Sequence, residues 1–366
     1  MTTASAQRLE FSTTLSANPV PAQRRAEILS DPGFGSSFTD HMVTVSWTPE
    51  AGWHGGGLRP YAPLSLDPAA AVLHYAQAIF EGLKAYRHDD GSIWAFRPDA
   101  NAARFTRSAH RMALPAFPEE SFVDAIDLLV RTDAEWVPAG AESSLYLRPF
   151  MFASEVFLGV RPAKEVTFNL IASPAGAYFS SGVKPVDIWL STDYTRAAPG
   201  GTGAAKCAGN YAASLVAQQQ ALEHGCAQVC FLDAVEHRWV EELGGMNLYF
   251  VRSDGSITTP GLTGTILEGI TRESILTLAG DLGYKVEERP VSIDEWRDGV
   301  TSGEITEVFA CGTAAVVTPL GRLVWDGGEV SMGTETGAVT SEIRAALLDI
   351  QYGRSEDKHG WMHRIL

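Results

Sequence analysis

The chain has 366 residues, of which 45% are hydrophobic and 20% are charged, a composition typical of globular proteins. Its length exceeds the usual limit for a single hydrophobic core and predicts two domains. A formal net charge of -16, without any basic run, argues against nucleic acid or an anionic membrane as a partner. No apolar run is long enough to cross a bilayer, and four scattered cysteines predict reduced thiols in the cytoplasm rather than a disulfide framework or a zinc site.

Patterns typical of strands and helices alternate through the first half of the chain. Phe38–Trp47 alternates between apolar and polar residues and predicts a strand, and the Gly- and Pro-rich stretch 47–63 predicts a long surface loop. A helix is predicted at Leu66–Ile79, followed by a hairpin at 80–97 that turns at an Asp-Gly pair. Two amphipathic helices are predicted at Pro98–Met112 and Glu119–Trp136, and then two strands at Ser143–Phe152 and Glu165–Ser173.

Two sets of polar residues in these elements each allow two interpretations. Arg104, Arg107 and Arg111 are spaced three and four apart, which puts them on one helix face. That face is either solvated or turns one arginine inward to hold an anion such as phosphate. Tyr146 and Arg148 lie on one face of their strand, where they either grip a carboxylate or form the outward polar face of an antiparallel sheet.

The best domain boundary is Ser173–Pro185, which is dense in serine, glycine and proline. We therefore predict a smaller N-terminal α/β domain at 1–176, a linker at 177–185 and a larger domain at 186–366. Helices of the larger domain are predicted at 211–224, Gly269–Leu282, Asp294–Asp298 and Ser341–Ile350. Its strands are predicted at Val186–Leu190, Ala227–Asp233, Met246–Val251, Tyr284–Arg289 and Ile305–Ala310.

The stretch Gly200–Tyr211, GGTGAAKCAGNY, places one lysine, Lys206, among four glycines and three alanines. The other five lysines lie in charged, turn-like or strand-end contexts that suit a solvated ammonium group. A phosphate loop would need glycine before the lysine and Ser or Thr after it, and a dinucleotide fingerprint would need glycine in place of the lysine. The stretch alone leaves two interpretations, a tight turn with a surface lysine or a lysine that forms an imine.

Other residues supply what one cofactor, pyridoxal 5'-phosphate, requires. It needs a lysine for the imine, an acid for the ring nitrogen, donors for the phosphate and a partner for the phenolic oxygen. The chain offers Lys206, the adjacent Glu241 and Glu242, Arg104 and Tyr211. A Gly-Ile-Thr at a helix start, Gly269–Thr271, and the small residues around Thr313 offer two cradles of backbone N–H groups for an anion.

Nine stretches, in order along the chain, resemble the branched-chain amino-acid aminotransferases of the fold-type IV pyridoxal-phosphate family. They are FTDHM (38–42), HYAQAIFEGLKAYR (74–87), LYLRP (145–149), YFSSG (178–182), GGTGAAKCAGNY (200–211), EELGGMNL (241–248), GITRES (269–274), GTAAVV (312–317) and DIQYG (349–353). The resemblance implies a two-domain α+β or α/β fold, in which the larger domain is a cofactor-binding pseudo-barrel and the site lies at the domain interface. It also implies a cytoplasmic homodimer in which the partner subunit completes the site.

The resemblance implies transamination of leucine, isoleucine or valine with 2-oxoglutarate, by a ping-pong reaction through pyridoxamine phosphate, in branched-chain amino-acid biosynthesis. Lys206 then forms the imine and transfers the proton, and Tyr211 contacts the phenolic oxygen. Glu242, five residues before Asn247, partners the ring nitrogen, with Glu241 as the alternative. The implied phosphate ligands are Arg104, Ile270, Thr271 and Thr313. The implied substrate-binding positions are Phe34, Tyr75, Phe80, Tyr146, Arg148 and Tyr178, with the main-chain N–H groups of Thr313 and Ala314 for the alpha carboxylate.

This chain departs from the family pattern in two places. Mammalian members carry a redox-active Cys-x-x-Cys where this chain has Ala315 and Thr318, which predicts no thiol switch here. Gly245 stands where some relatives carry a hydroxyl residue. D-Amino-acid aminotransferases and aminodeoxychorismate lyases, the rivals within the fold, lack the combination of LYLRP and FEGLKAY, and a non-catalytic carrier of the cofactor is the rival outside it.

Overall fold

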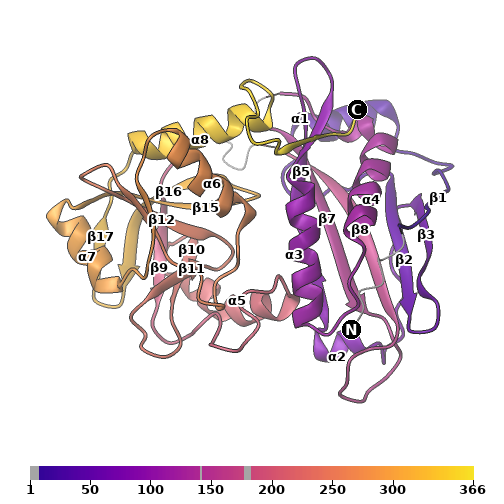
Figure 1. Ribbon diagram of the computed structural model, residues 1–366, viewed down its shortest axis with the longest axis horizontal. Coiled ribbons are helices and arrows are strands. Elements are labelled where there is room, and N and C mark those ends of the chain that lie inside the picture. Colours follow the sequence, from indigo (N-terminus) through magenta and orange to yellow (C-terminus); the bar gives the residue numbers. More distant parts are fainter. Residues whose placement is uncertain (1–7, 141, 177–182) are drawn as a thin grey trace. The chain divides into compact units, whose positions relative to one another are not determined.

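The computed structural model describes residues 8–140, 142–176 and 183–366. They divide into two compact units, each described here by itself (Figure 1). Unit 1 holds the chain before the 177–182 gap, together with Ala205–Ala208 and Ile350–Leu366, and unit 2 holds the rest up to Asp349. The predicted boundaries differ from this division, because they place both the Lys206 turn and the C-terminal segment in the second domain.

Unit 1 contains a nine-stranded sheet in the order β1-β3-β2-β8-β7-β5-β6-β18, with β4 paired to β7. Its strands are β1 (Ser12–Thr13), β2 (His41–Thr48), β3 (Gly52–Pro60), β4 (Ala78–Phe80), β5 (Leu83–Arg87), β6 (Ile93–Phe96), β7 (Ser144–Ala153), β8 (Val166–Ala175) and β18 (Met362–Arg364). Its helices are α1 (Ala22–Ser30), α2 (Ala71–Tyr75), α3 (Pro98–Arg111), α4 (Glu119–Thr132) and a short 3-10 helix at Ala134–Trp136. Helix α4 packs against β2, β8 and α3.

The core of unit 1 lies between its sheet and helices α3 and α4. Phe105 of α3 and Phe122 of α4 pack around Phe168 of β8, and Phe117 stacks on Phe168 with 4.0 Å between ring centroids. Each fully buried phenylalanine stabilises the fold by roughly 1.5–3 kcal/mol. Arg104, the neighbour of Phe105 on α3, is also buried, although the two side chains leave the helix about 100° apart.

The predicted surface loop at 47–63 is wrong, because β3 pairs there with β2 as an antiparallel hairpin. The sequence of β3, GWHGGGLRP, is rich in glycine, which is depleted in strands. The structure gives a reason for one of these glycines. A Cβ on Gly57 would lie 2.4 Å from the Ser12 hydroxyl of β1, so a small residue is needed where the N-terminal arm pairs.

The predicted helix at Leu66–Ile79 is much shorter than expected. It comprises only the five residues of α2, and Ala76 ends it in the left-handed region with φ of 50°. The chain then enters β4 and pairs with β7, which carries Tyr146 and Arg148. The last two residues of the predicted helix, Ala78 and Ile79, therefore belong to a strand, a case in which tertiary pairing outweighs a local pattern.

Unit 2 contains a nine-stranded mixed sheet in the order β11-β10-β9-β16-β15-β12-β13-β14, with β17 paired to β16. Its strands are β9 (Val186–Ser191), β10 (Gln228–Leu232), β11 (Val240–Leu243), β12 (Asn247–Arg252), β13 (Ile257–Thr259), β14 (Val286–Glu288), β15 (Ile305–Gly312), β16 (Val316–Trp325) and β17 (Gly328–Ser331). Its helices are α6 (Ile270–Asp281) and α7 (Ile293–Ser302), while α5 (Ala208–Glu223) and α8 (Ala338–Gln351) each extend one or two residues beyond the division.

Local signals explain the ends of one helix in unit 2. Ser292 caps α7 by accepting a hydrogen bond from the Glu295 N–H at 3.0 Å, and Gly303 ends it with φ of 78°. Trp296 on this helix is fully buried and packs edge-on against Phe250 of β12. Throughout the described residues, every helix is too short or too polar to cross a membrane.

Candidate functional site

Lys206 sits in a turn whose backbone is fixed by hydrogen bonds within unit 1. The Phe80 N–H donates to the Lys206 carbonyl at 3.0 Å, and the Lys206 N–H donates to the Ser108 hydroxyl at 3.0 Å. Ala205 and Cys207 on either side are buried, whereas Lys206 is half-buried. The turn therefore holds a lysine partly shielded from water on a rigid backbone, which argues against the surface-lysine interpretation.

Four of the predicted substrate-binding side chains gather with Lys206 in unit 1, and we call these five residues the Lys206 cluster. The Lys206 Nζ lies 4.9 Å from the centroid of the Phe80 ring, and the Arg148 guanidinium carbon lies 4.8 Å from the same centroid. Arg148 donates to the Tyr146 hydroxyl at 3.0 Å. Phe34 packs edge-on against Tyr146 with 5.0 Å between centroids. The cluster thus combines an amine, a guanidinium and three aromatic rings, which suits an anion with an apolar body.

Gly82 makes room for this cluster, because a Cβ on it would lie 2.0 Å from the Tyr146 hydroxyl oxygen. Tyr75, also predicted to line the pocket, is exposed on α2, and its hydroxyl donates to the Leu158 carbonyl. Tyr178 lies outside the described residues. The expectation that all five other lysines are solvated is wrong for Lys84, which is buried on β5.

Arg104, the predicted phosphate ligand, turns inward from α3 and pairs with a buried acid that the sequence analysis missed. Its Nε and Nη2 each lie 2.7 Å from a carboxylate oxygen of Glu81, and the Asn101 amide donates to Glu81 at 2.6 Å. Burial alone would raise the pKa of Glu81. The charge and hydrogen bonds of Arg104, then the charge of Lys206 and the Asn101 amide, outweigh burial and lower that pKa. Arg107 and Arg111 are exposed, so one arginine of the three is inward.

In unit 2, Glu242 lies buried on β11 and is held by several donors. Its Oε1 accepts from the Leu267 N–H at 2.8 Å and lies 2.9 Å from the Arg196 guanidinium, and its Oε2 accepts from the Asn247 amide at 3.3 Å. Arg196 also donates to the Thr265 carbonyl at 2.9 Å. The carboxylate is therefore fixed in position by a buried opposite charge, as a buried ion requires.

Glu241 precedes Glu242 on β11, so the two side chains leave opposite faces of the strand. The Thr265 hydroxyl donates to Glu241 Oε1, whereas the buried Oε2 has no hydrogen-bond partner. Burial raises the pKa of Glu241, against the lowering effects of Thr265 and Arg196. Adjacent carboxylates thus lie in two different environments.

Three glycines of unit 2 lie close to residues in or near the β11–β12 turn. A Cβ on Gly245, in that turn, would lie 3.8 Å from the Tyr211 ring. A Cβ on Gly312, at the end of β15, would lie 3.3 Å from the Met246 side chain. A Cβ on Gly269 would lie 2.0 Å from the Asn247 amide oxygen. We call these three positions the glycine cradle. A Cβ on Gly269 would clash with Asn247, one on Gly312 would require Met246 to shift slightly, and one on Gly245 would be in ordinary van der Waals contact.

Two backbone turns at the cradle present N–H groups. Gly269 caps α6 without a side chain, so the first N–H groups of the helix, at Ile270 and Thr271, point out of its N-terminus. Thr313 and Ala314 lie half-buried in the turn between β15 and β16. Val316, which closes that turn, has φ of 60°, an uncommon conformation for a β-branched residue that points to a constrained turn.

Each unit, taken by itself, carries groups that a phosphorylated pyridine cofactor requires. Unit 1 offers a partly shielded amine, and unit 2 offers a buried carboxylate, a tyrosine and a helix start at Gly269, where a Cβ would not fit. Sequence reasoning missed the supporting residues Glu81, Arg196 and Thr265. Glu81 lies within the motif FEGLKAY, and Arg196 lies four residues before Gly200, so proximity to a motif was the available signal. Among the described residues, histidine, cysteine and carboxylate side chains form no group of three suited to a metal.

A family model for class IV aminotransferases matches residues 78–323. The chain belongs to this family. Within it, a relative described as a probable branched-chain-amino-acid aminotransferase from Streptomyces coelicolor is 61% identical over 352 residues, which cover 96% of this chain and 97% of the relative. The predicted family is therefore confirmed.

Solved structures of class IV aminotransferases confirm the fold. A branched-chain amino acid aminotransferase from Escherichia coli superposes with a TM-score of 0.73 at 30% identity, covering 88% of this chain and 99% of that one. Another enzyme of the same name, from the organism abbreviated T.th., has been solved with pyridoxamine 5'-phosphate and, separately, with N-(5'-phosphopyridoxyl)-L-glutamate. Its two structures give TM-scores of 0.73 and 0.72 at 30% identity, and each covers 88% of this chain and 98% of that one. The mixed α/β fold of type IV expected from the sequence is thus the fold of this chain.

Proposed function

We propose that this protein transfers the amino group of branched-chain amino acids to 2-oxoglutarate, with pyridoxal 5'-phosphate as its cofactor. The observation that carries the proposal is the Lys206 cluster, where a partly shielded amine shares the Phe80 ring with Arg148. Support also comes from the 61% identical relative described as a branched-chain-amino-acid aminotransferase and from the cofactor forms in the solved relatives.

When bound, the cofactor supplies a carbonyl carbon that takes up the amino group and a ring that delocalises the charge developing at the substrate's alpha carbon. We assign Lys206 Nζ to hold that carbon covalently and to carry the proton to and from the alpha carbon. Glu242 keeps the ring nitrogen protonated, because a fixed carboxylate stabilises the pyridinium charge. Tyr211 contacts the phenolic oxygen.

Phosphate binding is assigned to both units. Arg104 supplies a guanidinium whose orientation is fixed by Glu81, and Ile270, Thr271 and Thr313 supply backbone or hydroxyl donors. A phosphate at the start of α6 would accept the N–H groups that the helix leaves unpaired.

Substrate binding is assigned to the Lys206 cluster and to the β15–β16 turn. Phe34, Phe80 and Tyr146 provide an apolar wall for a branched side chain, to which Tyr75 and Tyr178 are further proposed contributors. Arg148 and the Tyr146 hydroxyl provide donors for the distal carboxylate of glutamate. The Thr313 and Ala314 N–H groups are assigned to the alpha carboxylate. The apolar wall would bind a branched side chain, and Arg148 with the Tyr146 hydroxyl would bind the distal carboxylate of glutamate. The same site could therefore take both substrates.

The proposed assembly is a cytoplasmic homodimer in which the partner subunit completes the site. Three apolar side chains in the loop after β7 support it, since Val156, Leu158 and Val160 are 56%, 60% and 88% exposed. Large apolar side chains that are exposed close together in one loop are typical of interaction surfaces. Light scattering coupled to size-exclusion chromatography should give twice the mass of one chain. A monomer that retains full activity would contradict the proposed assembly.

The test of the proposed function is a panel of amino donors against 2-oxoglutarate, with glutamate formation as the readout. L-Leucine, L-isoleucine and L-valine should be used with the highest kcat/KM, and D-leucine should give no product. A preference for D-leucine would favour the D-amino-acid rival, and cofactor binding without turnover of any donor would favour the non-catalytic carrier.

A further inference from the structure

Two adjacent residues of unit 1, Asp40 and His41, join the two ends of a loop. The Ser16 N–H donates to His41 Nε2 at 2.9 Å, and the Val20 N–H donates to Asp40 Oδ1 at 2.7 Å. These hydrogen bonds close the chain from Ser16 to His41 into a loop that contains α1 and Phe34. We call the two residues the Asp40–His41 clamp. They lie in the stretch FTDHM, to which the proposed function assigns no role.

The clamp is itself fixed to the core of unit 1. His41 is buried, and its Nδ1 lies 2.6 Å from Oδ1 of the buried Asp133. Because Nε2 accepts from Ser16, the proton of the neutral ring is on Nδ1, which donates to Asp133. The second oxygen of Asp40 accepts from the buried Trp136 indole N–H at 2.7 Å. Each clamp side chain therefore connects the N-terminal arm to a buried residue that follows α4.

Phe34 lies in a part of this loop that is exposed and rich in glycine. Gly33 and Gly35, on either side of it, have φ of 60° and 70°, a conformation that favours glycine. The Phe34 ring is 49% exposed, and it joins the Lys206 cluster through its edge-on contact with Tyr146. One aromatic contact contributes little free energy to the fold. The position of the ring therefore depends on what holds the loop.

The half of the loop before Phe34 is attached to unit 1 mainly through the clamp. Helix α1 packs Ile28 and Leu29 against the core, but none of its residues is fully buried. Its ion pair joins Arg25 to Glu135, whose side chain is 79% exposed, and exposed ion pairs contribute little to stability. Hydrogen bonds to a partly buried carboxylate contribute more. The clamp is therefore the main polar attachment of this half.

The half of the loop after α1 follows the end of β8. The Gly176 N–H donates to the Gly33 carbonyl at 3.1 Å, and the Thr39 N–H donates to the Ala172 carbonyl at 3.0 Å. Strand β8 pairs with β7, which carries Tyr146. With the clamp closed, both halves of the loop are thus attached to the elements that position the Tyr146 ring.

We propose that the Asp40–His41 clamp positions Phe34 against Tyr146 and so sets the preference of the site for apolar over acidic substrates. The inference rests on the proposed function, in which Phe34 belongs to the apolar wall and Arg148 binds the distal carboxylate. Opening the clamp releases the arm and α1, and the Phe34 ring then leaves the wall. Arg148 stays in place, because it lies on β7, outside the loop. Loss of the clamp therefore weakens the use of leucine and spares 2-oxoglutarate.

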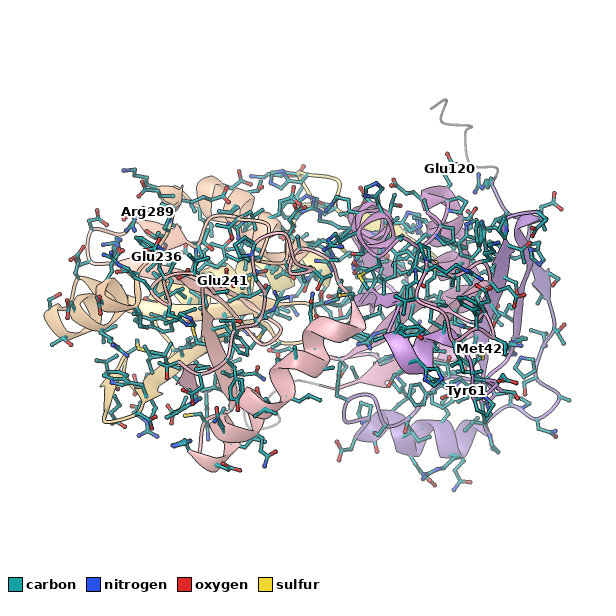
Figure 2. The ribbon with its side chains drawn as sticks, turned by 90° about the horizontal axis from the view of Figure 1, so that it is seen from below. Met42, Tyr61, Glu120, Glu236, Glu241 and Arg289 are labelled. Carbon is teal, nitrogen blue, oxygen red and sulfur yellow. The ribbon has the colours of Figure 1, made fainter. Side chains whose placement is uncertain are left out.

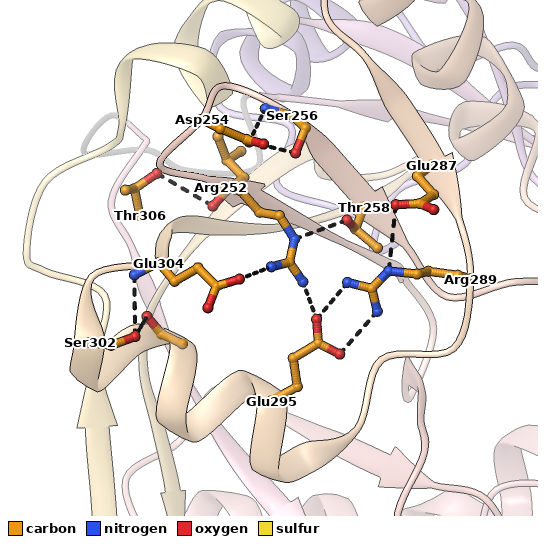
Figure 3. A network of polar contacts seen from close by, with 12 residues as sticks. Arg252, Asp254, Ser256, Thr258, Glu287, Arg289, Glu295, Ser302, Glu304 and Thr306 are labelled. Carbon is orange, nitrogen blue, oxygen red and sulfur yellow. Dashed lines mark hydrogen bonds and ion pairs between the residues drawn. The ribbon is translucent and has the colours of Figure 1, made fainter.

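The test is steady-state kinetics of the holoenzyme with Asp40→Ala, which removes both hydrogen bonds of that carboxylate. In a ping-pong reaction, kcat/KM for each substrate reports on its own half-reaction. We expect kcat/KM for L-leucine to fall about tenfold, as for a lost apolar contact, and kcat/KM for 2-oxoglutarate to change less than about twofold. Arg252→Gln, which breaks two ion pairs of a network in unit 2, is the control for lost stability and should change neither value (Figure 3).

A double variant shows whether Asp40 acts through Phe34. If it does, Asp40→Ala combined with Phe34→Ala loses no more kcat/KM for leucine than Phe34→Ala alone, because the two changes remove the same contact. Losses that multiply would overturn the proposal, and so would an Asp40→Ala protein in which both half-reactions fall equally or neither falls. If Asp40→Ala does not fold, Ser16→Pro replaces it, since proline removes the N–H that donates to His41 and leaves every buried side chain in place.

Failure of the proposed function would give a different result. A wild-type protein that turns over no amino donor contradicts that function, whereas hydrogen exchange still tests the clamp. The amides of residues 31–38 should exchange faster in Asp40→Ala than in wild type, because the loop is no longer closed. Equal exchange in the two proteins would show that the clamp does not hold the loop and would overturn the inference.

Discussion

Both units bury an arginine–glutamate pair, and the two pairs exchange roles. In unit 1, Arg104 is assigned to the cofactor and Glu81 orients it, whereas in unit 2, Glu242 is assigned to the cofactor and Arg196 orients it. All four side chains are at most 4% exposed. A charge that is buried away from water requires an opposite charge beside it. Arg104, assigned to the phosphate, is therefore paired with Glu81, and Glu242, assigned to the ring nitrogen, is paired with Arg196.

The two units also differ in what surrounds the pair. In unit 1 the contacts are made by side chains, as with the Phe80 ring between Lys206 and Arg148. In unit 2 the backbone at Gly269 and Gly312 comes close to the side chains of Asn247 and Met246, because these two residues lack a Cβ. We therefore expect side-chain truncations to damage unit 1 most, whereas additions at glycine should be harmful in both units, at Gly82 and at Gly269, where a Cβ would lie 2.0 Å from a side-chain oxygen.

We expect the largest effect on activity when the amine of Lys206 in unit 1 is removed. Lys206→Ala should lower kcat by roughly 10³-fold or more, since it removes both the covalent anchor and the proton-transfer group. The loss of cofactor absorbance at neutral pH provides a second readout. Lys164→Ala, at an exposed lysine, is the matched control and should leave both unchanged. Normal turnover by the Lys206→Ala protein would show that the amine of Lys206 is not needed for the reaction.

Breaking the pair in unit 1 should cost stability as well as activity. Glu81→Gln leaves Arg104 buried without a full counter-charge, which costs about 3–5 kcal/mol of unfolding free energy. Urea denaturation measures the change, and Glu120→Gln on the exposed start of α4 is the control (Figure 2). The pKa of Glu81 is lowered, so its contribution is fully present above its ordinary value of 4.5 and is lost as the pH falls through the lowered pKa. Equal urea midpoints for Glu81→Gln and Glu120→Gln would contradict the stabilising role of the Arg104–Glu81 pair.

Breaking the pair in unit 2 should affect the cofactor more than the fold. Arg196→Gln keeps a donor for the Thr265 carbonyl but removes the charge beside Glu242. We expect kcat to fall about tenfold to a hundredfold and the affinity of the apoprotein for pyridoxal phosphate to fall with it. Arg196→Lys should recover part of the loss. If neither variant changes cofactor affinity, Arg196 is only a structural residue.

The smallest effect is expected for an acid held by backbone alone. Backbone hydrogen bonds lower the pKa of Asp233 to about 2, against the raising effect of its burial. Asp233→Asn should cost about 2 kcal/mol at neutral pH. Because the folded pKa is lowered from 3.8, the difference between wild type and variant should be constant above that value and shrink as the pH falls toward 2. If the stability difference between wild type and Asp233→Asn grows as the pH falls, the pKa of Asp233 is not lowered in the folded protein.

Much of the fold could be predicted from residue patterns, and the failures have physical causes. The helix at Pro98–Met112 and the strand at Ser143–Phe152 have strong periodicity, and the structure places α3 and β7 there. The strand β3 was missed because it is rich in glycine, and the reason for Gly57 is its pairing with β1, which a local pattern does not reveal. The helix predicted at Leu66–Ile79 was too long because β4 pairs with a strand about 70 residues away.

The candidate site was predictable where a residue carries chemistry in a motif and not where it supports another residue. Lys206, Glu242 and Glu81 all stand in recognisable stretches, but the roles of Glu81 and Arg196 are defined by long-range contacts, Glu81 with Arg104 of α3 and Arg196 with Glu242 of β11. The absence of a thiol switch also remains a prediction from the sequence. Burial raises the pKa of Cys311, which favours the unreactive thiol form.

The roles proposed for the two arginine–glutamate pairs depend most on which glutamate of β11 contacts the ring nitrogen. The direct measurement is kcat/KM for leucine and 2-oxoglutarate in Glu242→Gln and Glu241→Gln, made side by side. Glu242 is held by Arg196, Asn247 and the Leu267 N–H, so its variant should lose roughly 10²-fold or more, and the Glu241 variant less than about tenfold. A larger loss in the Glu241 variant would reverse the assignment and with it the role proposed for Arg196.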